Sequence, residues 1–121
     1  MNKLLRRKID SYLAAWKNTP ERKPLIIKGA RQIGKTRSIE WFASQNYKNV
    51  IQINFVEQPK YKSIFEDGFE VDAILKNISY INPEIKFVDG DTLFFFDELQ
   101  ACPNCATSLK FFKLDGRFDV I

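Results

Sequence analysis

Apolar residues recur along the chain with two alternating periods, which predicts strands that alternate with helices. Helical spacing predicts helices over residues 5–16, 36–45, 71–81 and 107–114, with a shorter helical piece around 61–65. Continuous or alternating apolar runs predict strands over residues 25–28, 50–55, 93–96 and 118–121. This alternation is typical of right-handed crossovers and of a parallel sheet covered by helices on both faces. The expected fold class is therefore α/β.

The polarity of individual strands predicts where they lie in the sheet. Residues 93–96 are apolar on both faces, as a central parallel strand must be. In the strand at 50–55, isoleucine and phenylalanine alternate with glutamine and asparagine, which favours a position near the sheet edge. The strand at 118–121 is the last element, so we expect the chain to be a fragment whose sheet continues beyond it. The alternative is a complete strand at an edge.

The charge distribution predicts an anionic ligand for the amino-terminal third of the chain. The 121 residues carry a net charge of +4, but residues 1–37 hold 11 Lys and Arg against two acidic residues. Residues 38–121 hold 8 basic against 13 acidic residues. The ligand would be a nucleotide phosphate or a nucleic acid backbone. For the basic run at 3–8, a solvated helix face is the alternative.

Composition excludes several other classes of protein. The chain has no histidine, so it contains neither a Ser/His/Asp or Cys/His relay nor a histidine metal site. Its two cysteines are too few to close a four-ligand zinc site. No apolar stretch approaches the ~20 residues that cross a bilayer, and no apolar region follows the basic start as in a signal peptide. We expect a cytoplasmic protein without a membrane partner.

A phosphate-binding motif lies between the predicted strand at 25–28 and the helix at 36–45. The segment from Gly29 to Thr36 matches G-x-x-x-x-G-K-[ST] at every position. Its glycines allow backbone amides to surround a phosphate, and the next helix presents its positive amino-terminal end. Lys35 would reach the β- and γ-phosphates, and the Thr36 hydroxyl would ligate Mg²⁺. The expected nucleotide-binding residues are Gly29, Ala30, Arg31, Gln32, Ile33, Gly34, Lys35 and Thr36.

Two carboxylates, Asp97 and Glu98, directly follow the apolar strand at 93–96. Because parallel strands bring their carboxyl ends to one edge of the sheet, this pair and the phosphate loop should lie close together. Asp97 would hold Mg²⁺, usually through water, and Glu98 would orient and deprotonate the attacking water. Glu98 and Lys35 are the expected catalytic residues, and Thr36 and Asp97 the metal ligands. The alternative is that a carboxylate only caps the following turn.

Several segments together carry a family resemblance: residues 23–36, Ile53-Asn54-Phe55, the run from Thr92 to Gln100, the end at 118–121 and the opening at 6–13. They resemble prokaryotic AAA-type ATPases, whose ATPase core precedes a carboxy-terminal domain of unknown function. The resemblance implies a P-loop NTPase of the additional-strand catalytic-glutamate type, with a sheet of order 5-1-4-3-2 and strand 5 missing here. Residues 1–22 would be the amino-terminal helix and lead-in, and 23–121 the incomplete α/β core. No sensor or arginine finger can be assigned, since Arg117 lies before its strand and is expected at the wrong edge of the sheet.

The leading functional hypothesis is Mg²⁺-ATP binding and hydrolysis by the full-length protein, with ATP and Mg²⁺ as cofactors. The isolated fragment is expected to bind nucleotide weakly and to hydrolyse almost none, because it lacks the sensor and arginine groups. Because Asp97-Glu98-Leu99-Gln100 also resembles a D-E-x-Q box, a helicase-like nucleic-acid-dependent ATPase is one alternative. Nucleic acid would then bind the basic third or a region beyond the chain. A nucleotide-dependent interaction module without turnover is another alternative. An oligomer is compatible with each hypothesis, and adenine contacts are expected near residues 9–12.

Two weaker motifs favour packing over chemistry. Cys102-Pro103-Asn104-Cys105 lacks the partner pair that a metal or redox site needs, so loop packing is expected. Phe112-Lys113-Leu114-Asp115 lacks the asparagine of the guanine-reading N-K-x-D, which disfavours a GTPase. The 11 phenylalanines are expected in the core.

Overall fold

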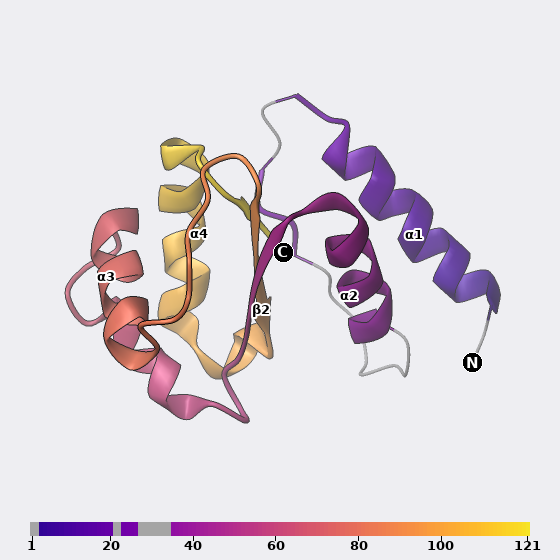
Figure 1. Cartoon of the computed structure of the whole chain (residues 1–121). Coiled ribbons are helices and arrows are strands. Elements are labelled where there is room, and N and C mark those ends of the chain that lie inside the picture. The colour runs from indigo at the N-terminus through magenta and orange to yellow at the C-terminus, as the bar shows by residue number, and fades with distance from the viewer. Residues whose placement is uncertain (1–2, 21–22, 27–34) are drawn as a thin grey trace.

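The described helices and strands follow each other in the predicted order, except that the strand predicted at 25–28 is not among them (Figure 1). The computed structural model describes residues 3–20, 23–26 and 35–121. Its helices are α1 (Lys3–Lys17), α2 (Lys35–Asn46), α3 (Val71–Ile81) and α4 (Pro103–Asp115), with the short 3₁₀ helices η1 (Pro59–Phe65) and η2 (Leu99–Ala101). Its strands are β1 (Asn49–Asn54), β2 (Thr92–Asp97) and β3 (Asp119–Val120).

The described strands form one parallel sheet in the order β1-β2-β3. The ladder between β2 and β3 continues past Val120, because the Ile121 amide donates to Phe94 and the Ile121 carbonyl accepts from Phe96, both at 2.9 Å. The apolar strand β2 is therefore central, as predicted. β1 has a neighbour on one side only among the described strands, and its Val50 side chain is 38% exposed. Among the described strands, this segment lies at the edge of the sheet, as predicted.

The strand predicted at 25–28 is only partly within the described residues. Leu25 and Ile26 belong to none of the three strands, and residues 27–28 lie outside the described part. The Leu25 amide donates to the Val120 carbonyl at 2.9 Å, so this segment runs beside β3. Leu25 and Ile26 are thus not part of a regular strand, and the rest of the predicted strand lies outside the described residues.

Successive residues of β2 point to opposite faces of the sheet, and each face has its own core. Phe94 and Phe96 belong to the cluster packed against η1, α3 and α4. Leu93 and Phe95 belong to a second cluster, formed with α1, α2 and Ile121. The helices thus cover both faces of the sheet (Figure 1), as expected for a parallel α/β sheet.

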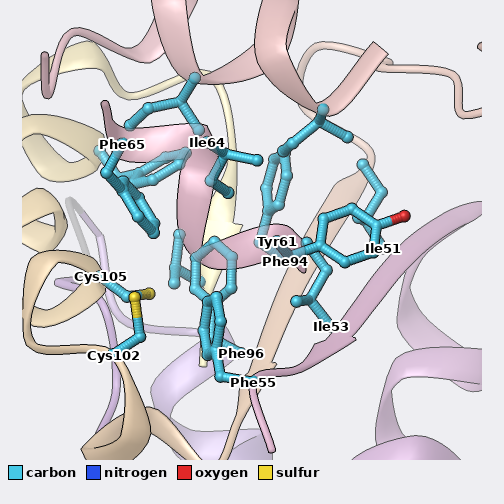
Figure 2. Packing of buried hydrophobic residues seen from close by; sticks show 14 of the residues in the cluster. Ile51, Ile53, Phe55, Tyr61, Ile64, Phe65, Phe94, Phe96, Cys102 and Cys105 are labelled. Carbon is cyan, nitrogen blue, oxygen red and sulfur yellow. The ribbon is translucent and has the colours of Figure 1, made fainter. Parts of the chain in front are cut away.

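The first of these clusters is built around the ring of Phe94, which is 0% exposed (Figure 2). Its centroid lies 5.3 Å from those of Phe112 and Phe118 and 5.7 Å from that of Phe96. Aromatic pairs at such distances add about 0.5–1.5 kcal/mol each beyond the area that they bury. The predicted burial of the phenylalanines is confirmed for this strand, and it gives the carboxyl end of β2 a rigid base.

Helix α1 packs on the second face beside α2, with the amino-terminal ends of both helices toward the same side of the molecule (Figure 1). The ring centroids of Trp16 and Phe42 are 6.2 Å apart. Lys17 lies 3.6 Å from a carboxylate oxygen of Asp119 and 4.3 Å from the ring centroid of Tyr47. Contacts to α2 and β3 therefore make α1 part of the packed domain.

Helix α4 begins four residues before its predicted start at 107. Pro103 occupies the first turn, where its missing amide hydrogen leaves no intrahelical bond unmade. The helix ends at Gly116, which has φ of 77° and allows the chain to turn toward β3. Among the helices described, none is long and apolar enough to span a lipid bilayer.

Candidate functional site

A cavity of about 80 Å³ lies at the carboxyl end of β2. Its described walls come from segments that are far apart in the sequence: Leu25, Ile26, Ile39, residues 95–100, Leu109 and Ile121. Leu25 and Ile26 precede the predicted phosphate loop, and Ile39 follows it on α2. Figure 1 shows the amino-terminal end of α2 on the same side of the molecule as the carboxyl end of β2. The flanks of the loop and the acidic pair therefore meet at one cavity.

The predicted phosphate-binding residues lie at the start of α2 or before it. Gly29, Ala30, Arg31, Gln32, Ile33 and Gly34 lie outside the described residues. Lys35 is the first residue of α2, but its side chain is also outside the described part. Thr36 is half-buried in the first turn of α2, and Arg37 is exposed. The motif thus opens a helix, which is the context that such a loop requires.

Asp97 is the last residue of β2 and is half-buried. Its Oδ1 accepts a hydrogen bond of 2.9 Å from the Glu98 amide. Its backbone carbonyl accepts another of 3.2 Å from the Phe55 amide, which follows β1. The carboxylate is therefore held against the start of the next turn, at the rim of the cavity.

Glu98 has a left-handed backbone, with φ of 59° and ψ of 47°. It is the one residue other than glycine with positive φ in the described part of the chain. Its carbonyl accepts from the Ala101 amide at 3.0 Å, which closes η2. Its Oε2 accepts a hydrogen bond from the side-chain amide of Gln100. This backbone conformation costs a residue with a Cβ about 1–2 kcal/mol, so Glu98 lowers the stability of the fold.

The turn that carries Glu98 packs against the cluster built around Phe94, the phenylalanine cluster. Leu99 and Ala101 pack against that cluster, and Cys102 is 3% exposed within it. The Cys102 amide donates to the Leu99 carbonyl at 3.0 Å. Two of the three residues of η2 are thus held by the core, whereas Gln100 between them is exposed.

Both cysteines of the Cys-Pro-Asn-Cys segment are buried in the core, which agrees with the predicted packing role, although Cys105 lies in the first turn of α4 and not in a loop. Cys102 is 3% and Cys105 0% exposed, and Figure 2 shows them together at the edge of the cluster. Burial, and then the neighbouring Cys102, raise the pKa of the Cys105 thiol well above its ordinary value. A buried neutral thiol is a poor nucleophile and metal ligand, which agrees with a packing role. In the described ranges, no three His, Cys, Asp or Glu side chains gather closely enough to hold a metal ion by themselves.

Arg117 lies away from the cavity. Its guanidinium is 2.6 Å from Asp72 and 2.7 Å from Asp115, just before β3 begins. Since the strands are parallel, this is the edge of the sheet opposite to the carboxyl end of β2. The expectation that Arg117 is on the wrong edge for an arginine finger agrees with this position.

Sequence reasoning missed two features of this site. One is the left-handed backbone of Glu98, and the other is the contact of Gln100 with the Glu98 carboxylate. The D-E-x-Q pattern was the available signal, because it places an amide two residues after the carboxylate. It gives no indication, however, that the chain turns back at this point.

Comparison with known proteins gives one match. The family model described as "AAA domain" matches residues 21–121. This span contains the phosphate motif, the acidic pair and every element from α2 to β3. No curated protein and no solved structure matches the chain.

Proposed function

The chain belongs to the AAA domain family, and from this premise we propose that it binds Mg²⁺-ATP and hydrolyses it. The family supports a nucleotide-binding function of the ATPase type. The single observation that carries the finer proposal is the cavity at the carboxyl end of β2. It is lined both by residues flanking the phosphate motif and by Asp97 and Glu98. The sheet order 5-1-4-3-2 belongs to the same proposal.

The phosphates would bind at the amino-terminal end of α2. The first amides of a helix have no partner within it, and they carry a partial positive charge that attracts anions. The residues from Gly29 to Thr36 would surround the phosphates with their amides, and Lys35 would contact the β- and γ-phosphates. Lys35 would also stabilise the negative charge that develops on the γ-phosphoryl group during transfer.

The residues at the cavity rim fit a magnesium ion. Mg²⁺ prefers hard oxygen ligands and keeps several of its waters. Thr36 offers a hydroxyl oxygen, and Asp97 offers a carboxylate whose Oδ1 is already oriented by the Glu98 amide. When bound, the ion would neutralise charge on the β- and γ-phosphate oxygens. Thr36 would hold it directly and Asp97 through water.

Glu98 would act as the general base. Its carboxylate would take a proton from a water whose oxygen attacks the γ-phosphorus, while the bond to the β–γ bridging oxygen breaks. ADP and inorganic phosphate are the products. General bases contribute about 10²- to 10⁴-fold to such rates, so Glu98→Gln should stop turnover while leaving ATP binding in place.

The proposal is tested in the full-length protein with Lys35→Ala and a matched control, Lys48→Ala. Lys48 is exposed between α2 and β1, at the other end of α2. We expect Lys35→Ala to lose ATP binding, measured by calorimetry, and phosphate release, with an unchanged circular dichroism spectrum. The control should match the wild type, and chelation of Mg²⁺ should abolish turnover. Unchanged binding and turnover in Lys35→Ala would refute the proposed function.

The same experiments separate the two alternatives. For an interaction module without turnover, Glu98→Gln would change neither bound nucleotide nor phosphate release. For a helicase-like motor, nucleic acid would stimulate turnover and strands would separate. Stimulation without strand separation would leave the first proposal standing. A cytoplasmic location and an oligomeric state stay predictions.

A further inference from the structure

We propose that Gln100 is a positioning residue, whose side-chain amide holds the Glu98 carboxylate in the orientation needed to activate water. The proposal rests on the proposed ATPase function and goes beyond it, since no part of that function requires Gln100. It is carried by the hydrogen bond from the Gln100 amide to Oε2 of Glu98.

The backbone brings these two side chains together. In an extended strand, residues 98 and 100 would point in the same direction about 7 Å apart. Here the left-handed Glu98 is followed by a single 3₁₀ turn, closed by the bond from the Ala101 amide to the Glu98 carbonyl at 3.0 Å. The turn folds Gln100 back beside Glu98, and both residues line the cavity. The strained backbone thus produces this contact.

The position of Gln100 is fixed by its neighbours. Leu99 and Ala101 pack against the phenylalanine cluster, and Cys102 is buried within it. The backbone of Gln100 is therefore held on both sides, and the exposed residue lines the cavity. An amide on such an anchored turn can restrict a glutamate, which otherwise has three rotatable side-chain bonds.

The chemistry of an amide suits this task. The Gln100 NH₂ group donates to the carboxylate, and a neutral amide does not take up the proton that the base must accept. A lysine or arginine there would form an ion pair and oppose proton transfer to Glu98. Where a general base activates water or another nucleophile, a further side chain commonly orients that base. Gln100 has the properties of such an orienting side chain for Glu98.

The test is the steady-state ATPase activity of Gln100→Ala. We expect kcat to fall about threefold to tenfold, the rate equivalent of one hydrogen bond, with unchanged KM and ATP affinity. The urea midpoint should fall by no more than about 0.15 M, because Gln100 is exposed. Gln45→Ala is the matched control, since Gln45 is an exposed glutamine near the carboxyl end of α2. It should match the wild type in every measurement.

A second variant separates positioning from the filling of space. Gln100→Glu keeps the size of the side chain but replaces the donor with a second carboxylate, so kcat should fall at least as far as in Gln100→Ala. A wild-type kcat in either variant refutes the role of Gln100 while the ATPase proposal stands. Equal losses of kcat and ATP affinity, or a fall of the urea midpoint well beyond about 0.15 M, would indicate a structural role and also refute it. If the wild-type protein hydrolyses no ATP, the proposed function fails, and this proposal fails with it.

Discussion

The backbone of Glu98 allows stability and activity to be separated by one substitution. Glu98→Asn and Glu98→Gln both replace the carboxylate with an amide, so both should lose turnover. They differ in how well they accept the left-handed conformation, with φ of 59°, that the structure imposes at this residue. Asparagine occurs there several times more often than most residues, whereas glutamine does not. We therefore expect the asparagine variant to be the more stable of the two.

The size of this difference follows from conformational preference. A roughly fourfold preference corresponds to about 0.8 kcal/mol, since RT is about 0.6 kcal/mol. Asparagine is one methylene shorter and loses the contact with Gln100, which is exposed, at a cost of about 0.3 kcal/mol. The net advantage of Glu98→Asn over Glu98→Gln is then about 0.5 kcal/mol. With a urea dependence of about 2 kcal/mol per molar, the midpoint should rise by about 0.25 M.

Urea unfolding can be followed by the fluorescence of Trp16 and Trp41, which lie on α1 and α2. Phosphate release measured on the same preparations gives turnover. The expected result is a higher urea midpoint for asparagine than for glutamine, with turnover reduced at least 100-fold in both variants. A midpoint for Glu98→Asn equal to or below that of Glu98→Gln would refute the assignment of strain to this residue.

Three further predictions concern the fold. Phe94→Ala should lower the free energy of unfolding by about 3–5 kcal/mol in urea titrations, because its ring is fully buried, whereas the 83% exposed Leu114→Ala should change it by less than about 0.5 kcal/mol. The Arg117 guanidinium, mainly through its side-chain hydrogen bond, lowers the pKa of Asp115 from its ordinary 3.8. The lowered pKa means that this contact stabilises the fold above about pH 4, and that the stabilisation is lost as the pH falls further. Arg117→Gln should therefore lower the free energy of unfolding by at most about 1 kcal/mol at pH 7 and by less at pH 3, as measured by thermal unfolding. Cys105 should react with iodoacetamide only after denaturation, since it is fully buried and burial raises its pKa; mass spectrometry showing rapid labelling of the native protein would contradict this.

Much of the fold could be predicted because each element carries its own pattern. The stripe at 71–81 matches α3 at both ends, and the apolar run at 93–96 lies within the central strand. The predicted start of α4 is wrong by four residues. Proline usually breaks a helix, but it is tolerated in the first turn, where Pro103 lies. The strand at 25–28 was expected from its apolar residues alone. A regular strand there also needs backbone amides and carbonyls of β3 as hydrogen-bond partners, which the sequence of 25–28 does not reveal.

Part of the candidate site can be predicted from short sequence patterns, and the rest depends on tertiary contacts. The phosphate motif and the Asp97-Glu98 pair are short, contiguous patterns, so they can be found in the sequence. The left-handed backbone at Glu98 cannot, because glutamate has no intrinsic preference for it. It results from two constraints on one short segment, the ladder that ends at Asp97 and the burial of Cys102 five residues later.

The run from Thr92 to Ala101 fills the middle of the sheet and also carries both carboxylates. No hinge or separate lobe lies between the most buried rings of the domain and the groups assigned to chemistry. Loss of packing around Phe94 should therefore disperse the catalytic groups in the same event. Turnover would then decline in proportion to the folded population, and residual enzymatic rate could serve as a sensitive gauge of how many molecules remain native.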